Sequence, residues 1–201
     1  FEQFSGLPGT VGGAVYMNAR CFEKSISDIL ESVEYFDLEK LEKCEYKFNA
    51  ADWNYKKSPF QSEEKVGTKL AITNSFKIIL SATFRLKAEI PNEEIKQRIA
   101  TECRHFNEER ISKGHFKFPS AGSVFKNNHD FGKPSGKIID EAGLKGYKIG
   151  GAQIAPFHGN FIINTGTANA EDIKRLVEFA KKTVAEKFGF ILEEEIIFVA
   201  E

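Results

Sequence analysis

Two kinds of hydrophobic periodicity follow one another along this chain of 201 residues, and together they restrict its fold class. Apolar and polar residues alternate from Ile72 to Lys87, which predicts one long half-buried strand. Residues 30–46 alternate on both sides of a polar turn and predict a hairpin. Apolar residues then take up helical spacing over 92–109. Because strands and helices mix without a regular strand–helix–strand rhythm, the sequence predicts an α+β fold.

The second half of the chain continues this mixture. A short helix is predicted for Lys137–Ala142, and Asn169 is a suitable N-cap for a longer helix that Gly189 ends. Phe161–Asn164 is typical of a compact apolar strand, and Ile191–Val199 is predicted to form a final strand.

The composition excludes several classes of function. Lys and Arg number 28 against 29 for Asp and Glu, so we expect no nucleic-acid partner and no attraction to an anionic membrane. The apolar runs are far shorter than the roughly 20 residues of a spanning helix. Three cysteines without CxxC spacing argue against a disulfide framework and favour a reducing cytoplasm. No metal site is predicted, because no paired spacing links His105, His115, His129 and His158.

Four glycines lie within eight residues between Gly6 and Gly13 (GLPGTVGG). Such a backbone can approach a ligand closely and point amide groups at anionic oxygens. The segment has neither the Gly-Lys-Ser/Thr of a Walker loop nor the GxGxxG spacing of a Rossmann turn. It predicts either a pyrophosphate cradle or a tight packing turn.

Three further segments carry side chains suited to chemistry. Residues 119–127 (PSAGSVFKN) place the Ser123 hydroxyl near Asn127 and beside a glycine, which indicates either a proton donor in a site or a Ser-Gly turn. The run EEE at 193–195 is either a solvated strand end or a source of one carboxyl group with a raised pKa. Residues 55–60 (YKKSPF) form a basic, aromatic loop that could hold a carboxylate or phosphate.

Taken in order, these segments resemble the UDP-N-acetylenolpyruvoylglucosamine reductase family. Residues 6–14 with MNA at 17–19 are similar to the family's flavin-side glycine segment, and 119–127 are similar to its catalytic-serine motif. GLKGYKIGGA at 143–152 and HGNFIIN at 158–164 resemble its C-terminal domain signature, and EEEI at 193–196 its closing acid motif. Since roughly the last two thirds of a typical member are covered, we expect an N-terminally truncated member.

The resemblance implies a partial FAD-binding domain of the PCMH type over 1–114, followed by a smaller α/β substrate-binding domain over 115–201. The boundary is expected at the break from Gly114 to Ser120. The implied reaction uses NADPH to reduce bound FAD, and the reduced flavin then passes hydride to the enolpyruvyl double bond of a UDP-sugar. The partners would be the UDP-sugar and NADPH, and the protein a cytoplasmic monomer.

Roles follow from the resemblance residue by residue. Ser123 would protonate the carbon that bears the ether oxygen, and Glu195 with the cation Lys56 would stabilise the enolate-like carboxylate. Arg110, Lys113 and Asn127 resemble substrate-side positions. The implied cofactor-binding residues are Gly6, Pro8, Gly9, Thr10, Gly12, Gly13 and Asn18.

Two departures from the family pattern concern the flavin side. Lys56 stands where the family usually has Arg, so the charge is kept while the two-pronged donor is lost. Arg20-Cys21-Phe22-Glu23 replaces the usual Gly-Ala-Tyr-Gly. Two other functions stay open: a nucleotide-sugar or flavin binding module without turnover, and another FAD-dependent oxidoreductase on the same scaffold, such as an alcohol or hydroxy-acid oxidase.

Overall fold

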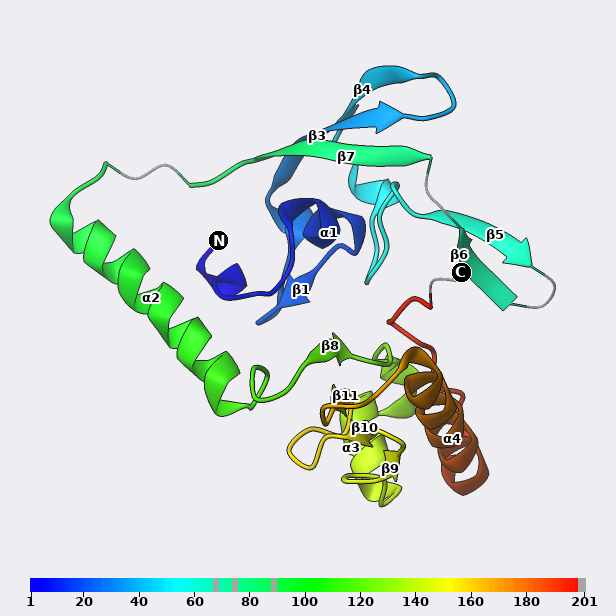
Figure 1. The fold of residues 1–201 in the computed structure, drawn as a ribbon. Helices are drawn as coiled ribbons and strands as arrows, with labels where there is room; N and C mark the ends of the chain where they lie inside the picture. Colours follow the sequence, from blue (N-terminus) through cyan, green and yellow to red (C-terminus); the bar gives the residue numbers. More distant parts are fainter. Residues whose placement is uncertain (67–68, 74–75, 88–89, 199–201) are drawn as a thin grey trace. The chain divides into compact units, whose positions relative to one another are not determined.

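The computed structural model describes residues 1–66, 69–73, 76–87 and 90–198, and it divides into two compact units, residues 1–107 and 108–201. Both units combine helices with antiparallel strands, as Figure 1 shows. Each also has its own hydrophobic core. The predicted α+β fold class is therefore confirmed.

The first unit is built on a three-stranded antiparallel sheet in the order β4-β3-β7, formed by Leu30–Asp37 (β3), Glu42–Lys47 (β4) and Lys77–Phe84 (β7). Val33 lies opposite Tyr46 on one side and Ala82 on the other. The predicted hairpin over 30–46 is thereby confirmed.

The single long strand predicted from Ile72 to Lys87 is wrong. Its first residues belong to β6 (Lys69–Thr73), which pairs with β5 (Ser62–Val66), while β7 pairs with β3. Residues 74–75 lie outside the described residues. The alternating pattern is continuous in the sequence, but its two parts pair with different strands.

Shorter elements complete the first unit. Alongside the helix α1 (Val11–Tyr16) there are two two-residue strands, β1 (Arg20–Cys21) and β2 (Lys24–Ser25), and three single 3-10 turns. The 3-10 turns are η1 (Glu2–Phe4), η2 (Ile26–Asp28) and η3 (Ala50–Asp52).

The core of the first unit lies between α1 and the sheet. Its buried residues are Val15, Ile26, Leu30, Val33 and Phe60. The Phe60 ring meets the rings of Tyr35 and Tyr46 edge-on, each with a centroid distance of 5.6 Å. Such edge-to-face contacts add to the gain from burial, so Phe60 anchors the loop before β5 to the sheet.

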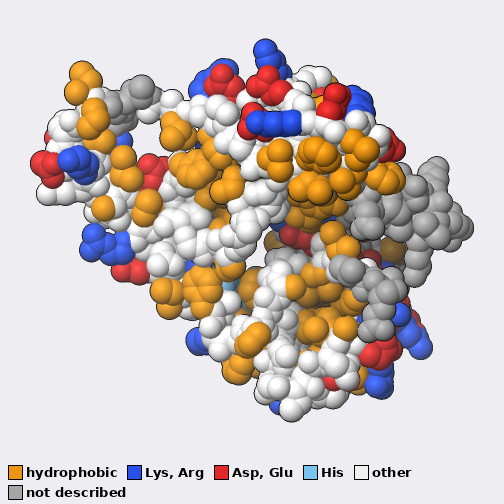
Figure 2. All heavy atoms as spheres, turned by 45° about the horizontal axis from the view of Figure 1, so that its top comes forward, with side chains coloured by type: hydrophobic (Ala, Val, Ile, Leu, Met, Phe, Trp, Pro, Cys, Tyr) orange, Lys and Arg blue, Asp and Glu red, His pale blue; other side chains and the backbone are white. Residues whose placement is uncertain are grey.

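The other face of the sheet carries exposed apolar side chains. Figure 2 shows hydrophobic side chains gathered beside charged ones on the surface. Phe76, Ile78 and Leu80 are each about half exposed, whereas Ile79 packs against the buried cluster. This alternation is what a strand buried on one face requires.

The second unit is a four-stranded antiparallel sheet in the order β8-β11-β10-β9 with two helices. Its elements are β8 (Ser120–Ser123), η4 (His129–Phe131), α3 (Ser135–Glu141), β9 (Lys148–Ile149), β10 (Ala152–Ile154), β11 (Phe161–Asn164) and α4 (Ala170–Phe188). The sheet and the two helices enclose a core that includes Val124, Ile138, Ile154 and Leu176.

The helix signals in the sequence were accurate. Asn169 caps α4 by accepting a hydrogen bond from the Asp172 N–H, and Gly189 ends the helix in the left-handed conformation. The predicted strand Phe161–Asn164 is β11, and the short helix predicted at Lys137–Ala142 is α3. The helix predicted over 92–109 is α2 (Glu93–Ser112), which crosses the division between the two units.

The predicted final strand Ile191–Val199 is wrong for the described residues 191–198. In this segment Glu194 forms an isolated bridge with Phe125, and Glu193 and Glu195 exchange backbone hydrogen bonds with Lys126 and Val124, next to β8. The alternating sequence therefore meets a partner over a few residues, too short a stretch to form a strand. Val199 lies outside the described residues.

Candidate functional site

The glycine segment of the first unit folds into a turn that leads into α1. The N–H of Gly13 donates to Thr10 Oγ1 at 3.0 Å, which caps the helix. Gly6 and Gly9 have positive φ angles of 71° and 121°, in the region that favours glycine. An added Cβ at Gly9 would meet no atom within 4 Å, so the backbone of this turn borders open space.

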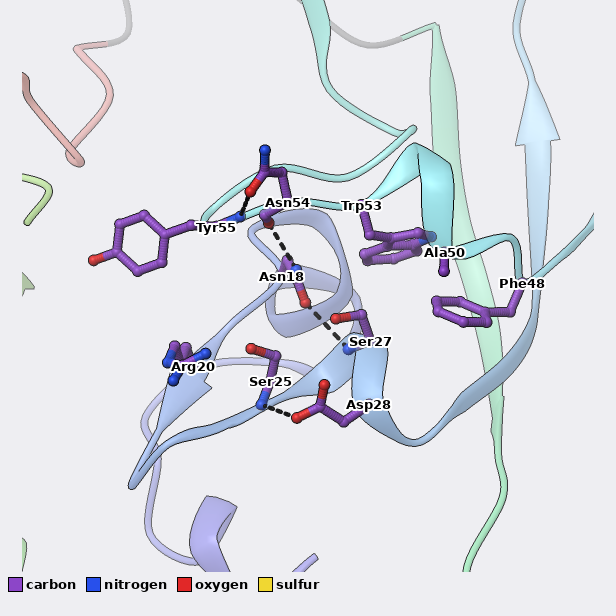
Figure 3. A pocket seen from close by; sticks show the side chains of 10 residues that line it. All are labelled: Asn18, Arg20, Ser25, Ser27, Asp28, Phe48, Ala50, Trp53, Asn54 and Tyr55. Atoms are coloured by element: carbon purple, nitrogen blue, oxygen red, sulfur yellow. Dashed lines mark hydrogen bonds between the residues drawn. The ribbon is translucent and has the colours of Figure 1, made fainter. Parts of the chain in front are cut away.

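Asn18, another predicted cofactor residue, is buried at 4% exposure and ties three loops of the first unit together. Its Nδ2 donates to the Asn54 carbonyl at 2.8 Å, and its Oδ1 accepts from the Ser27 N–H at 3.1 Å (Figure 3). Both ends of the amide are therefore engaged by the protein backbone. This side chain shapes the loops around a pocket.

The pocket beside Asn18 has a volume of about 320 Å³. Figure 3 shows Arg20 and Tyr55 on one part of its rim and Trp53 with Phe48 on another. Its lining residues are Asn18, Arg20, Ser25, Ser27, Asp28, Phe48, Ala50, Trp53, Asn54 and Tyr55.

Lys56 lies at the tip of a tight turn next to this pocket. Asn54 and Lys57 exchange backbone hydrogen bonds of 3.2 and 3.0 Å across the turn, and Lys56 takes a positive φ of 55°. Its Nζ is 5.9 Å from the centroid of the Tyr55 ring. The turn therefore presents a cation beside an aromatic ring.

Two polar residues for which no role was predicted connect this turn to the glycine segment: Ser58, inside the YKKSPF segment, and Gln61, directly after it. Ser58 Oγ donates to the Tyr16 carbonyl at 2.7 Å, and Gln61 Nε2 donates to the same oxygen at 2.8 Å. Gln61 Nε2 also lies 3.2 Å from the Lys56 carbonyl. The end of α1 and the Lys56 turn are thus held together by side chains that carry no signal in the sequence beyond their polarity.

In the second unit, Ser123 lines a pocket of about 370 Å³. Ser123 is the last residue of β8 and lies opposite Phe161 of β11. The preceding Gly122 has a φ of 82°, which allows the chain to turn before the serine. The lining residues of this serine pocket are Ser123, Asn127, Pro134, Gly136, Lys137, Asp140, Lys145, Phe157, His158, Gly159 and Asn160.

Asn127, a predicted substrate residue, lies on the same pocket and also shapes it. Its Oδ1 accepts from the Ser135 N–H at 2.9 Å, at the start of α3. The fully buried Ser135 hydroxyl donates to the Lys126 carbonyl at 2.6 Å. These bonds fix the segment after Ser123 against the helix that forms the opposite wall.

The acidic run at 193–195 runs beside the serine strand. The Glu195 N–H donates to the Val124 carbonyl at 2.7 Å, so the backbones next to Ser123 and at Glu195 touch. Glu193 pairs with Lys126, and Glu194 pairs with Lys181 at 2.6 Å. Among the described residues that line the serine pocket, Glu195 is absent.

Arg110 and Lys113 lie at the C-terminal end of α2 in the part that belongs to the second unit. Arg110 is buried at 5% exposure, and its carbonyl accepts from the His115 N–H at 3.2 Å. Lys113 pairs with Glu109. Neither cation is among the residues that line the serine pocket in the described part of the chain.

Two histidines pack together near the serine pocket. The rings of His115 and His158 lie 6.2 Å apart, and both contact Phe161. Burial lowers the pKa of His158, and burial followed by the charge of His158 lowers the pKa of His115. Burial thus favours the neutral form of both rings.

The predicted site residues divide between the two units. The glycine segment, Asn18 and Lys56 lie in the first, while Ser123, Asn127, Glu195, Arg110 and Lys113 lie in the second. Within the described ranges, no group of three or more His, Cys, Asp or Glu side chains is placed to hold a metal ion. No helix in the described part of the chain is long and apolar enough to cross a membrane.

Comparisons with known proteins cover both units. Residues 114–199 match the family model of the UDP-N-acetylenolpyruvoylglucosamine reductase C-terminal domain. The UDP-N-acetylenolpyruvoylglucosamine reductase of Treponema denticola is 55% identical over 100% of this chain and 60% of its own length, and that of Borreliella burgdorferi is 44% identical over 98% and 60%.

A crystal structure gives the same result. The UDP-N-acetylenolpyruvylglucosamine reductase of Thermus caldophilus superimposes with a TM-score of 0.71 at 35% identity, over 96% of this chain and 62% of that one. This chain thus spans about 60% of the length of the curated relatives it matches. Sequence and structure together show that the chain belongs to the UDP-N-acetylenolpyruvoylglucosamine reductase family.

Proposed function

We propose that this chain takes part in the flavin-dependent reduction of UDP-N-acetylglucosamine enolpyruvate to UDP-N-acetylmuramate with NADPH. The observation that carries the proposal is the serine pocket, where a hydroxyl, a carboxamide and a neutral imidazole line one cavity in a chain 55% identical to a named reductase. The product is a precursor of the bacterial cell wall.

We assign the two parts of the chain different tasks within this reaction. Residues 1–114 contribute to a FAD-binding domain, and residues 115–201 form the substrate-binding domain. The match of 114–199 to the family's C-terminal domain supports this division, and the two compact units, which divide between residues 107 and 108, each have a core of their own.

The first unit offers residues that fit a flavin. The turn from Gly6 to Gly13 has exposed backbone, and the open space at Gly9 would admit a flat ring or a phosphate. In this proposal Gly6, Pro8, Gly9, Thr10, Gly12 and Gly13 hold the cofactor, and Asn18 supports the adjoining loop. The bound flavin would supply hydride, which NADPH replenishes.

The chain's own residues would supply orientation, a proton and charge stabilisation. The Ser123 hydroxyl donates a proton to the carbon that bears the ether oxygen, on the face open to the serine pocket. Lys56, by its charge, and Glu195, as a hydrogen-bond donor in its acid form, would stabilise the enolate-like carboxylate that forms after hydride addition. Arg110, Lys113 and Asn127 hold the substrate, the two cations by charge and Asn127 by its amide.

The absorbance of the purified protein tests this function. A flavin spectrum that NADPH bleaches, and that UDP-N-acetylglucosamine enolpyruvate restores without oxygen, is the expected result. Flavin or nucleotide binding without bleaching would instead support a binding module. Bleaching that the enolpyruvyl substrate fails to reverse would support a different oxidoreductase.

The serine role has a matched control on the same strand. Ser123→Ala is expected to slow the return of flavin absorbance by about 100-fold or more, the usual contribution of a positioned acid, and to leave the bleaching by NADPH nearly unchanged. Ser120→Ala removes the other hydroxyl of β8, which accepts from the Gly122 N–H at 3.0 Å and is not among the described residues that line the pocket; it controls for a lost hydroxyl and a lost turn bond beside Ser123 and should leave both steps nearly intact. Equal slowing of both steps in Ser123→Ala would contradict the assignment.

We further propose that the protein acts as a cytoplasmic monomer with UDP-sugar and NADPH as its only partners. The near balance of 28 basic and 29 acidic residues supports the absence of nucleic-acid and membrane partners. Sedimentation at several protein concentrations would test the monomer.

A further inference from the structure

We propose that Asn160 is the positioning residue of the serine pocket, because it fixes the strand that carries Ser123 and the ring of His158 at the same time. The catalytic meaning of this inference rests on the proposed function, whereas the hydrogen-bond network itself does not.

Asn160 is buried at 4% exposure and binds the two residues that follow Ser123. Its Oδ1 accepts from the Phe125 N–H at 2.9 Å, and its Nδ2 donates to the Phe125 carbonyl at 2.8 Å. Its own carbonyl accepts from the Val124 N–H at 2.9 Å. One residue thus satisfies three backbone groups directly after the proposed proton donor.

The amide is matched to this task by its chemistry. A planar carboxamide offers one acceptor and one donor, as the N–H and C=O of a single backbone residue require. Asp would place an acceptor against the Phe125 carbonyl, and Leu would leave both backbone groups unpaired at a buried site.

The backbone of Asn160 also orients the ring of His158. Its N–H donates to His158 Nδ1 at 3.2 Å, so Nδ1 is the acceptor of the neutral ring and the proton lies on Nε2. His158 lines the serine pocket together with Ser123. The network therefore sets the hydroxyl and the imidazole N–H on one pocket wall.

Close packing keeps Asn160 in place. A Cβ added at Gly136 would lie 3.4 Å from both the Cβ and the backbone N of Asn160, so the start of α3 presses directly against it. Because Asn160 packs against α3 on one side and hydrogen-bonds to the residues after Ser123 on the other, it restricts the motion of the strand that carries Ser123. Since a misplacement of about 1 Å can cost about 100-fold in rate, this rigidity bears directly on proton delivery.

Asn160→Asp tests the network, with Asn164→Asp as a matched control: Asn160 directly precedes β11, and Asn164 is its last residue. Asn164 also accepts backbone N–H groups, those of Gly166 and Ala168, and donates one bond of 3.4 Å to the Ala168 carbonyl. It does not line the serine pocket in the described part of the chain. Each variant keeps its acceptor and loses one donor.

The first measurement is amide hydrogen exchange, which needs no turnover. Asn160→Asp keeps the acceptors of the Val124 and Phe125 N–H groups but turns a carboxylate oxygen toward the Phe125 carbonyl, and this repulsion should open the site locally and speed exchange at both amides by about tenfold or more. Asn164→Asp should leave these two amides unchanged. Unchanged exchange in Asn160→Asp would overturn the proposal.

The second measurement follows the two half-reactions. Asn160→Asp should slow flavin reoxidation by the enolpyruvyl substrate about 100-fold at saturation, with little change in the half-saturating concentration and in the bleaching by NADPH. Normal reoxidation despite faster exchange would reduce Asn160 to a structural role, and equal loss in both steps would indicate general damage. Either result would overturn the positioning role.

A third measurement uses the unaltered protein and stays decisive if Asn160→Asp does not fold. The ¹⁵N chemical shifts of His158 should report a protonated Nε2 and an unprotonated Nδ1. The opposite tautomer would overturn the proposal. If the unaltered protein shows no flavin reduction or reoxidation, the proposed function fails, and the exchange and tautomer results still decide whether Asn160 organises this pocket.

Discussion

Gly159→Ala is the sharpest test of how the serine pocket is built. A Cβ at Gly159 would lie 2.3 Å from the carbonyl oxygen of Gly136 and 3.3 Å from the backbone N of Asp140. Carbon and carbonyl oxygen normally approach no closer than about 3.3 Å, so the loop and α3 would have to separate by about 1 Å. Both neighbours are backbone atoms of one helix, so no side-chain rotation relieves the contact.

The expected cost follows from this geometry. Overpacking that forces backbone shifts typically costs about 1–3 kcal/mol, and we expect about 2 kcal/mol for this substitution. In a chain of this size, that corresponds to a fall in Tm of about 4–8 °C. Because Gly136 and Gly159 both line the serine pocket, the proposed function predicts that the same shift weakens binding of the UDP-sugar substrate.

Gly136→Ala adds the same methyl group on the α3 side of this packing, where it would meet Asn160 and His158. Its Cβ would lie 3.4 Å from Asn160 atoms, which is tight but tolerable, and alanine favours the helix by up to about 1 kcal/mol. We therefore expect its stability to stay near that of the unaltered protein. Urea unfolding of the three proteins measures these differences. Equal stability of Gly159→Ala and the unaltered protein, or equal losses in the two variants, would refute the packing argument.

Three more predictions concern the second unit. Below pH 6.5 His158 becomes protonated in the unfolded chain, whereas burial resists its protonation in the folded protein. The free energy of unfolding should therefore fall as the pH drops below that value. Urea titrations at several pH values would measure this fall. Asn169→Ala removes the cap of α4 and should lower the free energy of unfolding by about 1 kcal/mol, which urea unfolding would measure. Lys181→Met should lower the free energy of unfolding by up to about 1 kcal/mol at low salt and by less at high salt. The reason is that the half-buried ion pair between Lys181 and Glu194, which the variant lacks, is electrostatic.

Each of these predictions has its own control. His158→Gln should reduce the pH dependence to the part that His115 contributes, and an unchanged slope would assign the dependence to other groups. Asn169→Ser retains a capping oxygen and should stay close to the original stability. Lys182→Met breaks only an exposed 3.8 Å contact with Glu186, so a loss equal to that of Lys181→Met would show that the Glu194 bond contributes nothing specific.

Local signals in the sequence determined α2, α3, α4 and the hairpin, whereas the short helix α1 was not predicted. Asn169 and Gly189 mark the ends of α4 because capping depends on residues within a few positions of the helix end. The alternation over 30–46 was sufficient to predict the pairing of β3 with β4, since these two strands follow one another in the chain. The order of the family motifs was likewise readable from the sequence, and the comparisons agree with it.

The tertiary structure alone decided how distant segments meet. Whether residues 72–87 form one strand or two, and whether the segment after Ile191 enters the sheet, depends on partner strands that an alternating pattern does not specify. The hydrogen bonds from Asn160 reach Phe125 across 35 residues, and those from Ser58 reach Tyr16 across 42. A polar residue in a sequence shows what it can bond to, but only the folded chain places one particular N–H or carbonyl within its reach.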